Sequence, residues 1–513
     1  MEKFLWEKNY NKQPKINAWF AFPAIESFAM ASVGYLSIFK MLDLMPDVYV
    51  ERIYQDTKTT RVCADDVSLL GFSTSFEIDI LTVIKMLKKY EIPIKSQDRG
   101  ENDPLVFAGG PAVCANPLPY QDFYDFIIIG EGQLLPEVFQ FVADNKDLSR
   151  DELLEKLSKF SGIWVPKFGK YDVEFHRDNL VEPVYTSILS DKSFFHDTFV
   201  IEIERGCPKM CNFCLASWLN LPTRFLEVEK ILRDIEMALK YTNKIALLGA
   251  YVAGHPGFDK IIDFIKEKHK ISPIELSISS LRADLADEKL FKTLVECGQK
   301  HATIAIEAGS ERMRKIIKKD LSDEQIFKTV ETARKSGLKG IKIYTMIGFP
   351  KETDEDIEAL IEIAKKLKNQ NKGFDISFSL STLIPKAHTP FENVKKEDSK
   401  SLDKKINYIK KQMHQIGVTL RPTSVEWDAI QAILSRCGYS LADYLVEVSA
   451  QGGNLGAFKH VWKDFYKNKK LPQSFDEATT LPYLDENEIP WEFIKACPRD
   501  VLKNRQKEYL EIK

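Results

Sequence analysis

Two kinds of apolar pattern alternate along this chain, one typical of strands and one typical of helices. Short apolar runs rich in Val, Ile, Phe and Tyr are typical of buried strands. The segments between them place apolar residues at helical spacing, as in the stretch from Ile78 to Tyr90. Strands that alternate with amphipathic helices predict a parallel sheet covered by helices. In the N-terminal part of the chain we expect strands at 18–22, 48–54, 68–74, 104–110 and 126–132.

A second series of the same kind begins near Thr198. Each of its first five strands is followed by a helical pattern, so this part of the sequence predicts six β/α units in a row. They indicate a partial (β/α)6 barrel of the TIM type, open along one side. In parallel barrels the chemistry lies at the C-terminal ends of the strands. The expected strands are 199–205, 244–251, 274–281, 302–309, 341–348 and 376–385.

These patterns place the chain in the α/β class and divide it into four parts. Residues 1–150 are expected to form a doubly wound, Rossmann-like domain, and residues 151–195 a connector with short strands. Residues 196–394 are expected to form the partial barrel, and residues 395–513 a mostly helical C-terminal region. The Lys-rich start of that last region is interpreted as a solvated helix face, with a nucleic-acid patch as the minority interpretation.

Composition changes this picture little. Hydrophobic residues make up 44% and charged residues 29% of the 513-residue chain, as in ordinary globular proteins. The net charge of −3 argues against a global basic field for nucleic acid and leaves a local patch open. The most apolar stretch, Ile16 to Leu36, contains Pro23 and Glu26, so we expect strand, loop and helix there and no membrane span. A polar N-terminus and five scattered cysteines predict a protein of the reducing cytoplasm.

The remaining three cysteines stand together in the stretch ERGCPKMCNFCLA, directly after the first barrel strand. Cys207, Cys211 and Cys214 have the spacing C-x3-C-x2-C. Three thiolates on one short loop can bind three irons of a [4Fe–4S] cube and leave the fourth iron open to another ligand. A structural zinc site would need a fourth ligand, and the nearest histidines, His196 and His255, are not close in sequence. A catalytic thiol would not explain why there are three.

With an aromatic residue before the third cysteine, this motif on the first loop of a six-unit series resembles the radical SAM superfamily. Residues 304–326 resemble the fourth-strand motif for S-adenosylmethionine (SAM), and residues 341–357 resemble the fifth-strand motif, whose Gly-Phe-Pro backbone lies near the adenine. Residues 381–392 resemble the sixth-strand segment of the branch that carries an N-terminal cobalamin-binding-like domain. The resemblance is good over residues 199–392 and looser over the rest of the chain from about residue 65 onward.

The resemblance implies roles for the residues that match these motifs. The three clustered cysteines would bind the cluster. Two of the residues named below have alternative roles: Arg282 can instead form a surface salt bridge, and Glu307 can instead cap a helix. The implied SAM contacts are Phe213 at the adenine, Ser280 and Arg282 at the carboxylate, Glu307, Gly309 and Ser310 at the ribose and methionyl end, and Gly348 and Pro350 at the adenine.

One departure from the family pattern concerns the second barrel strand. Many members of the superfamily have Gly-Gly-Glu after that strand, where it meets the amino group of SAM. Here the strand ends in the sequence Leu-Gly-Ala-Tyr, residues 248–251. Recognition of the amine must therefore use other groups. His255 is one candidate, with a purely structural histidine as the alternative.

The first domain resembles cobalamin-binding domains in its loops. Doubly wound sheets bind ligands at the carboxyl ends of their strands, where Ser73, Gly109 and Gly110 fall. Glycine lets a backbone approach a flat ligand closely. The usual D-x-H-x-x-G loop is missing, and the first histidine of the chain is His176. Two interpretations stay open: cobalamin bound without a histidine from residues 1–175, or a fold kept for packing or substrate binding.

The resemblance implies an enzyme that reductively cleaves SAM to a 5′-deoxyadenosyl radical, with an electron donor such as flavodoxin or ferredoxin. Methyl transfer through cobalamin and a cobalamin-free rearrangement are both open, and the substrate is not indicated. Methylthiolation is disfavoured, because such enzymes use a second three-cysteine cluster in the N-terminal domain, which here has only Cys63 and Cys114. A non-catalytic iron–sulfur protein is the alternative from another class.

Overall fold

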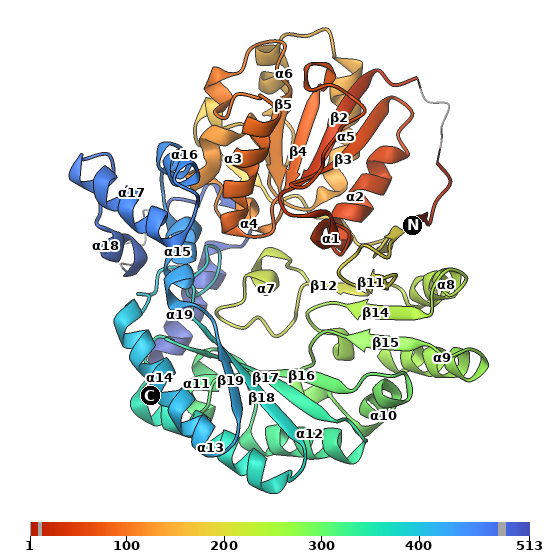
Figure 1. Cartoon of the computed structure of the whole chain (residues 1–513), viewed down its shortest axis with the longest axis vertical. Coiled ribbons are helices and arrows are strands. Elements are labelled where there is room, and N and C mark those ends of the chain that lie inside the picture. The colour runs from red at the N-terminus through yellow and green to blue at the C-terminus, as the bar shows by residue number, and fades with distance from the viewer. Residues whose placement is uncertain (1, 9–12, 481–488, 513) are drawn as a thin grey trace.

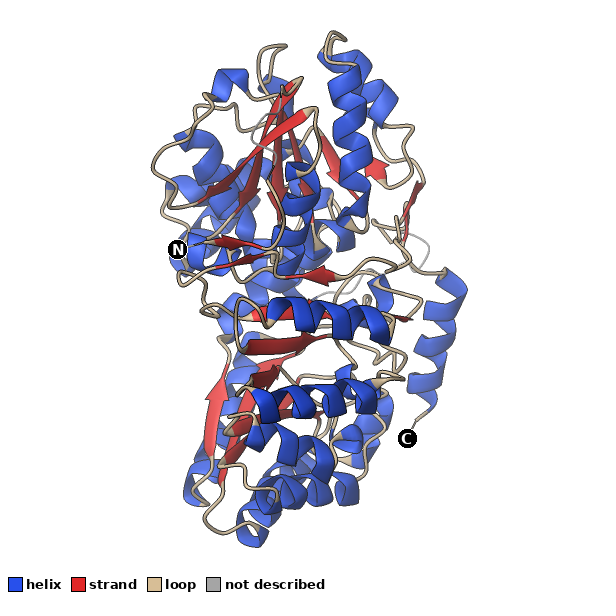
Figure 2. Ribbon diagram, turned by 90° about the vertical axis from the view of Figure 1, so that its right-hand side faces the viewer, coloured by secondary structure: helices blue, strands red, loops and turns tan. Residues whose placement is uncertain are grey.

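The computed structural model describes residues 2–8, 13–480 and 489–512. An N-terminal sheet with helices on both faces stands above a partial barrel, and C-terminal helices run along one side of both (Figure 1). Turned by a quarter, the same two units are stacked one on the other (Figure 2). The predicted α/β class, with its doubly wound domain, partial barrel and helical C-terminal region, is confirmed.

The N-terminal sheet has six strands in the order β3-β2-β4-β5-β6-β7. The first five in this order are parallel and β7 is antiparallel. Counted along the chain, the parallel strands have the order 2-1-3-4-5, which is the flavodoxin-like doubly wound arrangement. The bounds are β2 (Ile16–Phe22), β3 (Val48–Tyr54), β4 (Leu69–Ser73), β5 (Leu105–Gly109), β6 (Phe126–Ile128) and β7 (Ile163–Trp164).

Two apolar cores cover the faces of this sheet, and they draw on different parts of the chain. One core packs the sheet against N-terminal helices, namely α1 (Glu26–Ala29), α2 (Val33–Asp43), α5 (Leu135–Asp144) and α6 (Arg150–Leu157). The other uses α3 (Ile80–Lys89) and α4 (Pro111–Ala115) together with C-terminal helices α15 (Val425–Arg436), α16 (Ala442–Ala450) and α17 (Leu455–Lys467). The C-terminal region therefore completes the first sheet.

The barrel consists of two four-stranded sheets, β15-β14-β11-β9 and β16-β17-β18-β19. A parallel bridge between Leu281 and Ile304 joins them. The bounds are β9 (Val184–Tyr185), β11 (Phe199–Glu202), β14 (Lys244–Leu248), β15 (Glu275–Ile278), β16 (His301–Glu307), β17 (Gly340–Ile347), β18 (Asp375–Thr382) and β19 (Thr419–Pro422). The six predicted strands are present, and β9 and β19 are added at the two edges.

Helices outside the barrel bury the apolar side of every strand in one continuous core. They are α8 (Val228–Ala238), α9 (Phe258–Ile271), α10 (Glu288–Glu296), α12 (Asp323–Lys335), α13 (Asp354–Gln370) and α14 (Ser399–Gln415). Two short strand pairs and two helices lie outside these units. They are β1 (Lys3–Phe4) with β10 (Ile188–Leu189), β8 (Val173–Glu174) with β20 (Ile494–Lys495), α18 (Phe475–Thr480) and α19 (Arg499–Glu511). Within the described part of the chain, no helix has the length and apolar character needed to cross a membrane.

Candidate functional site

The carboxyl ends of the N-terminal sheet and of the barrel strands face one another, and buried ion pairs join them. Lys386, which follows β18, pairs with Glu77, which follows β4. Arg205 and Arg224 each bind Glu131, which follows β6, at 2.6 Å. Because Glu77 and Glu131 are almost fully buried, losing Lys386, or both arginines, would leave an uncompensated buried charge. These ion pairs hold the carboxyl ends of the N-terminal sheet against those of the barrel.

The cysteine loop begins in a turn that only glycine tolerates. It follows β12 (Glu204–Arg205), which pairs with β13 (Arg224–Phe225), and it leads into α7 (Leu215–Leu219). Gly206 has φ = +88°, and a Cβ there would lie 2.5 Å from the carbonyl oxygen of Asn220. The backbone of the loop therefore folds directly against the residue that follows α7.

The three cysteines are free thiols held on a loop that is tied at both sides. Cys207 and Cys211 are buried and Cys214 is half-buried. The indole of Trp218 donates to the Cys211 carbonyl at 2.9 Å. The Asn212 side chain donates at 2.7 Å to the Ile316 carbonyl at the end of α11 (Glu311–Ile316). The loop is thereby fixed to its own helix and to the helix after the fourth barrel strand.

The chemistry of these thiols fits an iron–sulfur cluster. Burial raises the pKa of Cys211 to about 12 and also raises the pKa of Cys207, so both thiols keep their protons until a metal replaces them. Within residues 2–8, 13–480 and 489–512, no three metal-binding side chains of the His, Cys, Asp or Glu type converge on a single ion. Thiolates that each bind a different iron of a cube do not need to meet at one point.

Arg282 lies beside the cysteines as part of a buried charge cluster. Its Nε donates to Asp284 at 2.9 Å and its Nη2 donates to the Lys319 carbonyl at 2.9 Å. The Lys319 ammonium lies 3.1 Å from Glu307, which has φ = +66°. This group of charged side chains brings together two residues of the predicted SAM site, Arg282 and Glu307. Ser280, also predicted for that site, is exposed. Arg282 is thus ion-paired in the interior of the site.

Gly309 and Ser310 have structural reasons to be where they are. A Cβ at Gly309 would lie 2.3 Å from the backbone nitrogen of Leu360 in α13. Ser310 is the N-cap of α11, accepts a hydrogen bond from the Met313 amide at 3.0 Å and donates to Asp356. Close helix packing and helix capping therefore account for both residues, and a contact with SAM remains a prediction.

The loop after the fifth strand meets the cysteine loop through aromatic rings. The ring centroids of Phe213 and Phe349 lie 6.0 Å apart. Gly348, with φ = +81°, donates its amide to Glu352 at 2.9 Å, and Pro350 is half-buried. Residues 213 and 348–350, predicted to line one adenine, thus lie together in the fold.

Glu204 is a residue of the site that sequence reasoning missed. Its side chain is 1% exposed and accepts a hydrogen bond from the Tyr251 amide, in the loop where the Gly-Gly-Glu motif is absent. A Cβ at Gly249 would lie 2.1 Å from its Oε1, and its Oε2 has no partner among the described residues. Burial raises the pKa of Glu204 to about 7. His255, the candidate predicted from the sequence, already uses both ring nitrogens. Its Nε2 hydrogen-bonds to the Leu226 carbonyl, and its Nδ1 accepts from the Gly257 amide.

The glycines of the N-terminal loops are explained by contacts inside the protein. Ser73 is paired with Gly109, and the Thr74 amide donates to the Gly109 carbonyl at 2.8 Å. Gly110 has φ = +112°, and a Cβ there would lie 2.2 Å from the Thr74 carbonyl oxygen. The two predicted cobalamin loops therefore contact each other. This contact accounts for Gly110 without a ligand, and the cobalamin contacts remain predictions.

Comparison with known proteins identifies the family. The family "Radical SAM proteins, N-terminal" matches residues 34–166, and "Radical SAM superfamily" matches residues 201–364. The chain belongs to the radical SAM superfamily. The family inferred from the cysteine motif is confirmed, and it implies a [4Fe–4S] cluster and SAM as cofactors.

Two relatives and one solved structure show how far this radical SAM protein resembles others. An uncharacterized protein of Methanocaldococcus jannaschii is 33% identical over 412 residues, 79% of this chain and 84% of that protein. An uncharacterized methyltransferase of Pyrococcus horikoshii is 27% identical over 341 residues, 61% of this chain and 66% of that protein. The cobalamin-dependent S-adenosylmethionine radical enzyme OxsB, solved with aqua-cobalamin bound, shares the fold with a TM-score of 0.55 at 15% identity, over 96% of this chain and 72% of that chain.

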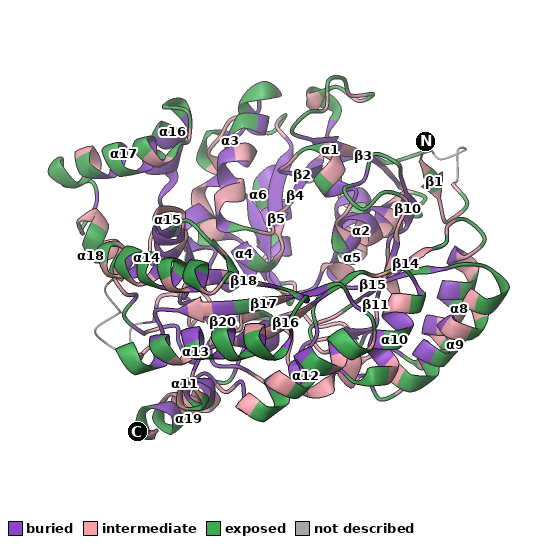
Figure 3. Ribbon diagram, turned by 60° about the horizontal axis from the view of Figure 1, so that its bottom comes forward, coloured by how far each residue is buried: buried purple, intermediate pink, exposed green. Residues whose placement is uncertain are grey.

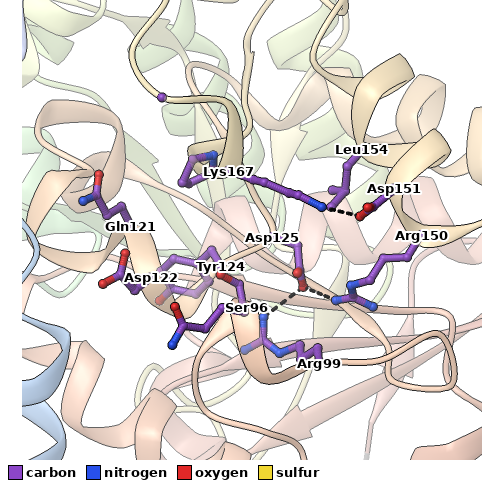
Figure 4. A pocket seen from close by; sticks show the side chains of 13 residues that line it. Ser96, Arg99, Gln121, Asp122, Tyr124, Asp125, Arg150, Asp151, Leu154 and Lys167 are labelled. Atoms are coloured by element: carbon purple, nitrogen blue, oxygen red, sulfur yellow. Dashed lines mark hydrogen bonds and ion pairs between the residues drawn. The ribbon is translucent and has the colours of Figure 1, made fainter.

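A separate hollow of about 550 Å³ lies at the amino ends of β5 and β6, away from the radical SAM site (Figure 4). There Arg99 and Arg150 converge on Asp125 at 2.9 and 2.7 Å. Both guanidinium groups also donate to backbone carbonyls of neighbouring loops. The charges of this hollow are satisfied within the protein and serve to tie the loops together.

Proposed function

We propose that Cys207, Cys211 and Cys214 hold the [4Fe–4S] cluster of this radical SAM enzyme, and that SAM lies across the carboxyl ends of the barrel strands. The observation that carries the proposal is three free thiols on one anchored, largely buried loop beside the Arg282 and Lys319 cations. When bound, the cluster and SAM supply a 5′-deoxyadenosyl radical that can take a hydrogen atom from an unactivated carbon.

Arg282 is our candidate for the SAM carboxylate. Its Nε and Nη2 are engaged by Asp284 and by the Lys319 carbonyl, which fixes the plane of the guanidinium group. No hydrogen bond to another described residue uses Nη1, so this atom can donate to a bound carboxylate. A preorganised arginine loses less conformational freedom on binding than a mobile one.

The loop at residues 249–251 is our candidate for the SAM amino group. The Tyr251 amide donates to Glu204, and the peptide bond is planar, so the Ala250 carbonyl of the same peptide points away from Glu204. Glu204 thereby orients this carbonyl as a hydrogen-bond acceptor. In this proposal Glu204 and its loop replace the missing Gly-Gly-Glu motif.

Variants of Arg282 and Glu307 test the SAM site. We expect Arg282→Ala and Glu307→Ala to weaken SAM binding about tenfold or more while iron content stays unchanged, because a charged hydrogen bond contributes about 1.5–3 kcal/mol. Iron content and SAM affinity are measured on anaerobically reconstituted protein. The control is Arg233→Ala, since Arg233 is exposed on α8. Unchanged SAM affinity in both site variants would refute the assignment.

Methyl transfer through cobalamin is our second candidate function. It is favoured by a fold shared with OxsB over 96% of the chain and by the facing carboxyl ends of the two sheets. Residues 1–175 contain no histidine, so we expect cobalamin to bind without an imidazole from its own domain. His388, from the barrel, lies against the backbone of Ala115 and is buried.

Titration with hydroxocobalamin tests this second function, followed by electron paramagnetic resonance of the Co(II) form. A spectrum without nitrogen splitting is expected. Nitrogen splitting that disappears in His388→Ala would assign the axial ligand to the barrel, and no binding at all would remove methyl transfer through cobalamin. In either function the electron comes from a small redox protein, for which a flavodoxin or ferredoxin is our proposal.

A further inference from the structure

The barrel strands are covered on one face only. Ile343 and Phe378 point toward the outer helices and are fully buried. The alternate residues Lys342, Tyr344 and Ser377 are half-buried or exposed, and Tyr344 keeps 37% of its surface accessible. The resulting mixture of buried and exposed positions on the barrel strands is visible in Figure 3. The inner face of the barrel is therefore an accessible surface.

Strand register arranges the inner face in layers. One layer contains Lys342, with Thr303 and Ser377 beside it on the adjacent strands. The next layer toward the carboxyl ends contains Tyr344 and Ser379, followed by Arg421 on β19. The layer above that contains Met346 and Ser381, and a bulge in β16 places Glu307 beside Thr345, one residue before Met346. Side chains of one layer on neighbouring strands are close enough to act on one ligand.

The residues of these layers are unusual for a barrel interior. Barrels of this type commonly fill the interior with bulky branched side chains. Here β18 presents Ser377, Ser379 and Ser381 in succession, and Ser277 and Ser279 lie on or just after β15. Small hydroxyl side chains leave room and supply hydrogen bonds, so this interior is built to hold a polar molecule.

The layers of Lys342 and Tyr344 also carry positive charges that no described carboxylate neutralises. Neither Lys342 nor Arg421 has a carboxylate partner among the described residues, and the Lys342 ammonium lies 4.8 Å from the centre of the Tyr344 ring. Glu202, on β11, is neutralised by Arg205 at 2.6 Å. Asp375, at the amino end of β18, lies near His301 instead. Lys342 on β17 and Arg421 on β19 lie in consecutive layers on either side of β18, so their long side chains can both reach an anion held over β18.

We propose that the substrate is a small, hydroxyl-bearing organic anion whose carboxylate or phosphate group is bound by Lys342 and Arg421. This inference rests on the proposed function and names the substrate class for it. Two residues along a strand span about 7 Å, so the anionic group would lie roughly 7–13 Å below the layer of Met346, which is at the carboxyl ends of the strands where we propose that SAM binds. A molecule of metabolite size meets this requirement.

Matched small ligands test the proposal on the full, cluster-loaded protein. Glycerol 3-phosphate and glycerate carry the proposed chemistry with different anions, and glycerol lacks the charge. We expect at least one of the two anions to bind by titration calorimetry and glycerol not to bind. Lys342→Gln and Arg421→Gln should each weaken anion binding at least fivefold. Lys328→Gln, which changes an exposed lysine on α12, should leave it unchanged.

The outcomes separate this inference from the proposed function. Preference for one anion identifies the group that is recognised. Equal binding by wild type and both site variants, equal binding of glycerol, or no anion binding by the wild type would overturn the inference. Production of 5′-deoxyadenosine from SAM by the wild-type protein is measured independently. Its absence alone would count against the proposed function and not against the anion site.

Discussion

Replacement of Glu204 by Gln is the most informative single change in this protein. In the folded chain burial raises the pKa of Glu204 from its ordinary value of 4.5 to about 7. The folded state therefore binds this proton more tightly than the unfolded state, and unfolding releases it between these pH values. Stability contributed by the group falls as pH rises through this window and is lowest above pH 7.

The size of the effect follows from the pKa. Each unit by which the pKa is raised from 4.5 to about 7 corresponds to ~1.4 kcal/mol of folding free energy. The ionised carboxylate therefore destabilises the fold by about 3 kcal/mol at pH 8. Glutamine keeps an oxygen to accept the Tyr251 hydrogen bond and is neutral at every pH. We expect Glu204→Gln to be more stable than wild type by about 2–3 kcal/mol at pH 8 and to differ by less than about 0.5 kcal/mol at pH 5.

Urea unfolding of the cluster-free proteins at pH 5, 6, 7 and 8 provides the measurement. Only the difference between variant and wild type is interpreted, because other titrating groups contribute equally to both. The control is Glu236→Gln, which changes an exposed carboxylate on α8 that pairs with Lys268 and should gain no stability at pH 8. A stability difference for Glu204→Gln that does not change with pH would refute the reasoning.

Three further predictions concern the cluster, the junction between the sheets and the N-terminal loops. Reconstituted Cys214→Ala should lose its cluster, whereas Cys297→Ala should keep about four irons per chain by iron analysis. Glu131→Gln should lower the free energy of unfolding by about 3 kcal/mol, because it leaves the half-buried Arg224 without a carboxylate and Arg205 with Glu202 alone; urea titration measures this, and no loss would contradict the ion pairs of Glu131. Gly110→Ala should destabilise by about 2 kcal/mol or more through its contact with the Thr74 carbonyl, and a stable variant would contradict that packing.

Most elements of this fold follow from local sequence patterns. The prediction of a strand at 48–54 coincides with β3, and the helix predicted from Ile78 to Tyr90 contains α3. Period-two and helical spacings are properties of consecutive residues, so they survive without tertiary information. The cysteine motif is equally local, since three ligands of one cluster stand on one loop.

The edges of the barrel could not be found in this way. β9 and β19 are short, and each is a strand because it pairs with a neighbour already in place. The sequence predicts a mostly helical region around β19, and the described residues of that region form helices together with the short strands β19 and β20. Pairing partners distant in sequence decide the state of such short segments.

Glycine loops illustrate a motif whose physical reason only the tertiary structure reveals. A glycine with positive φ is compatible with a ligand or with another loop lying close, and the sequence is the same in both cases. At Gly110 the close neighbour is Thr74 of the adjacent loop.

The sequence by itself therefore determined the order of strands and helices, the division into an N-terminal sheet and a barrel, and the three cysteines, because all of these depend on short-range spacing. Only the tertiary structure decided that Glu204 lies beneath Gly249, and that Lys342 and Arg421 stand on one inner face of the barrel. Those contacts depend on strand register and on the curvature of the sheet. Both are set by long-range packing of many residues, and no short stretch of the chain encodes them.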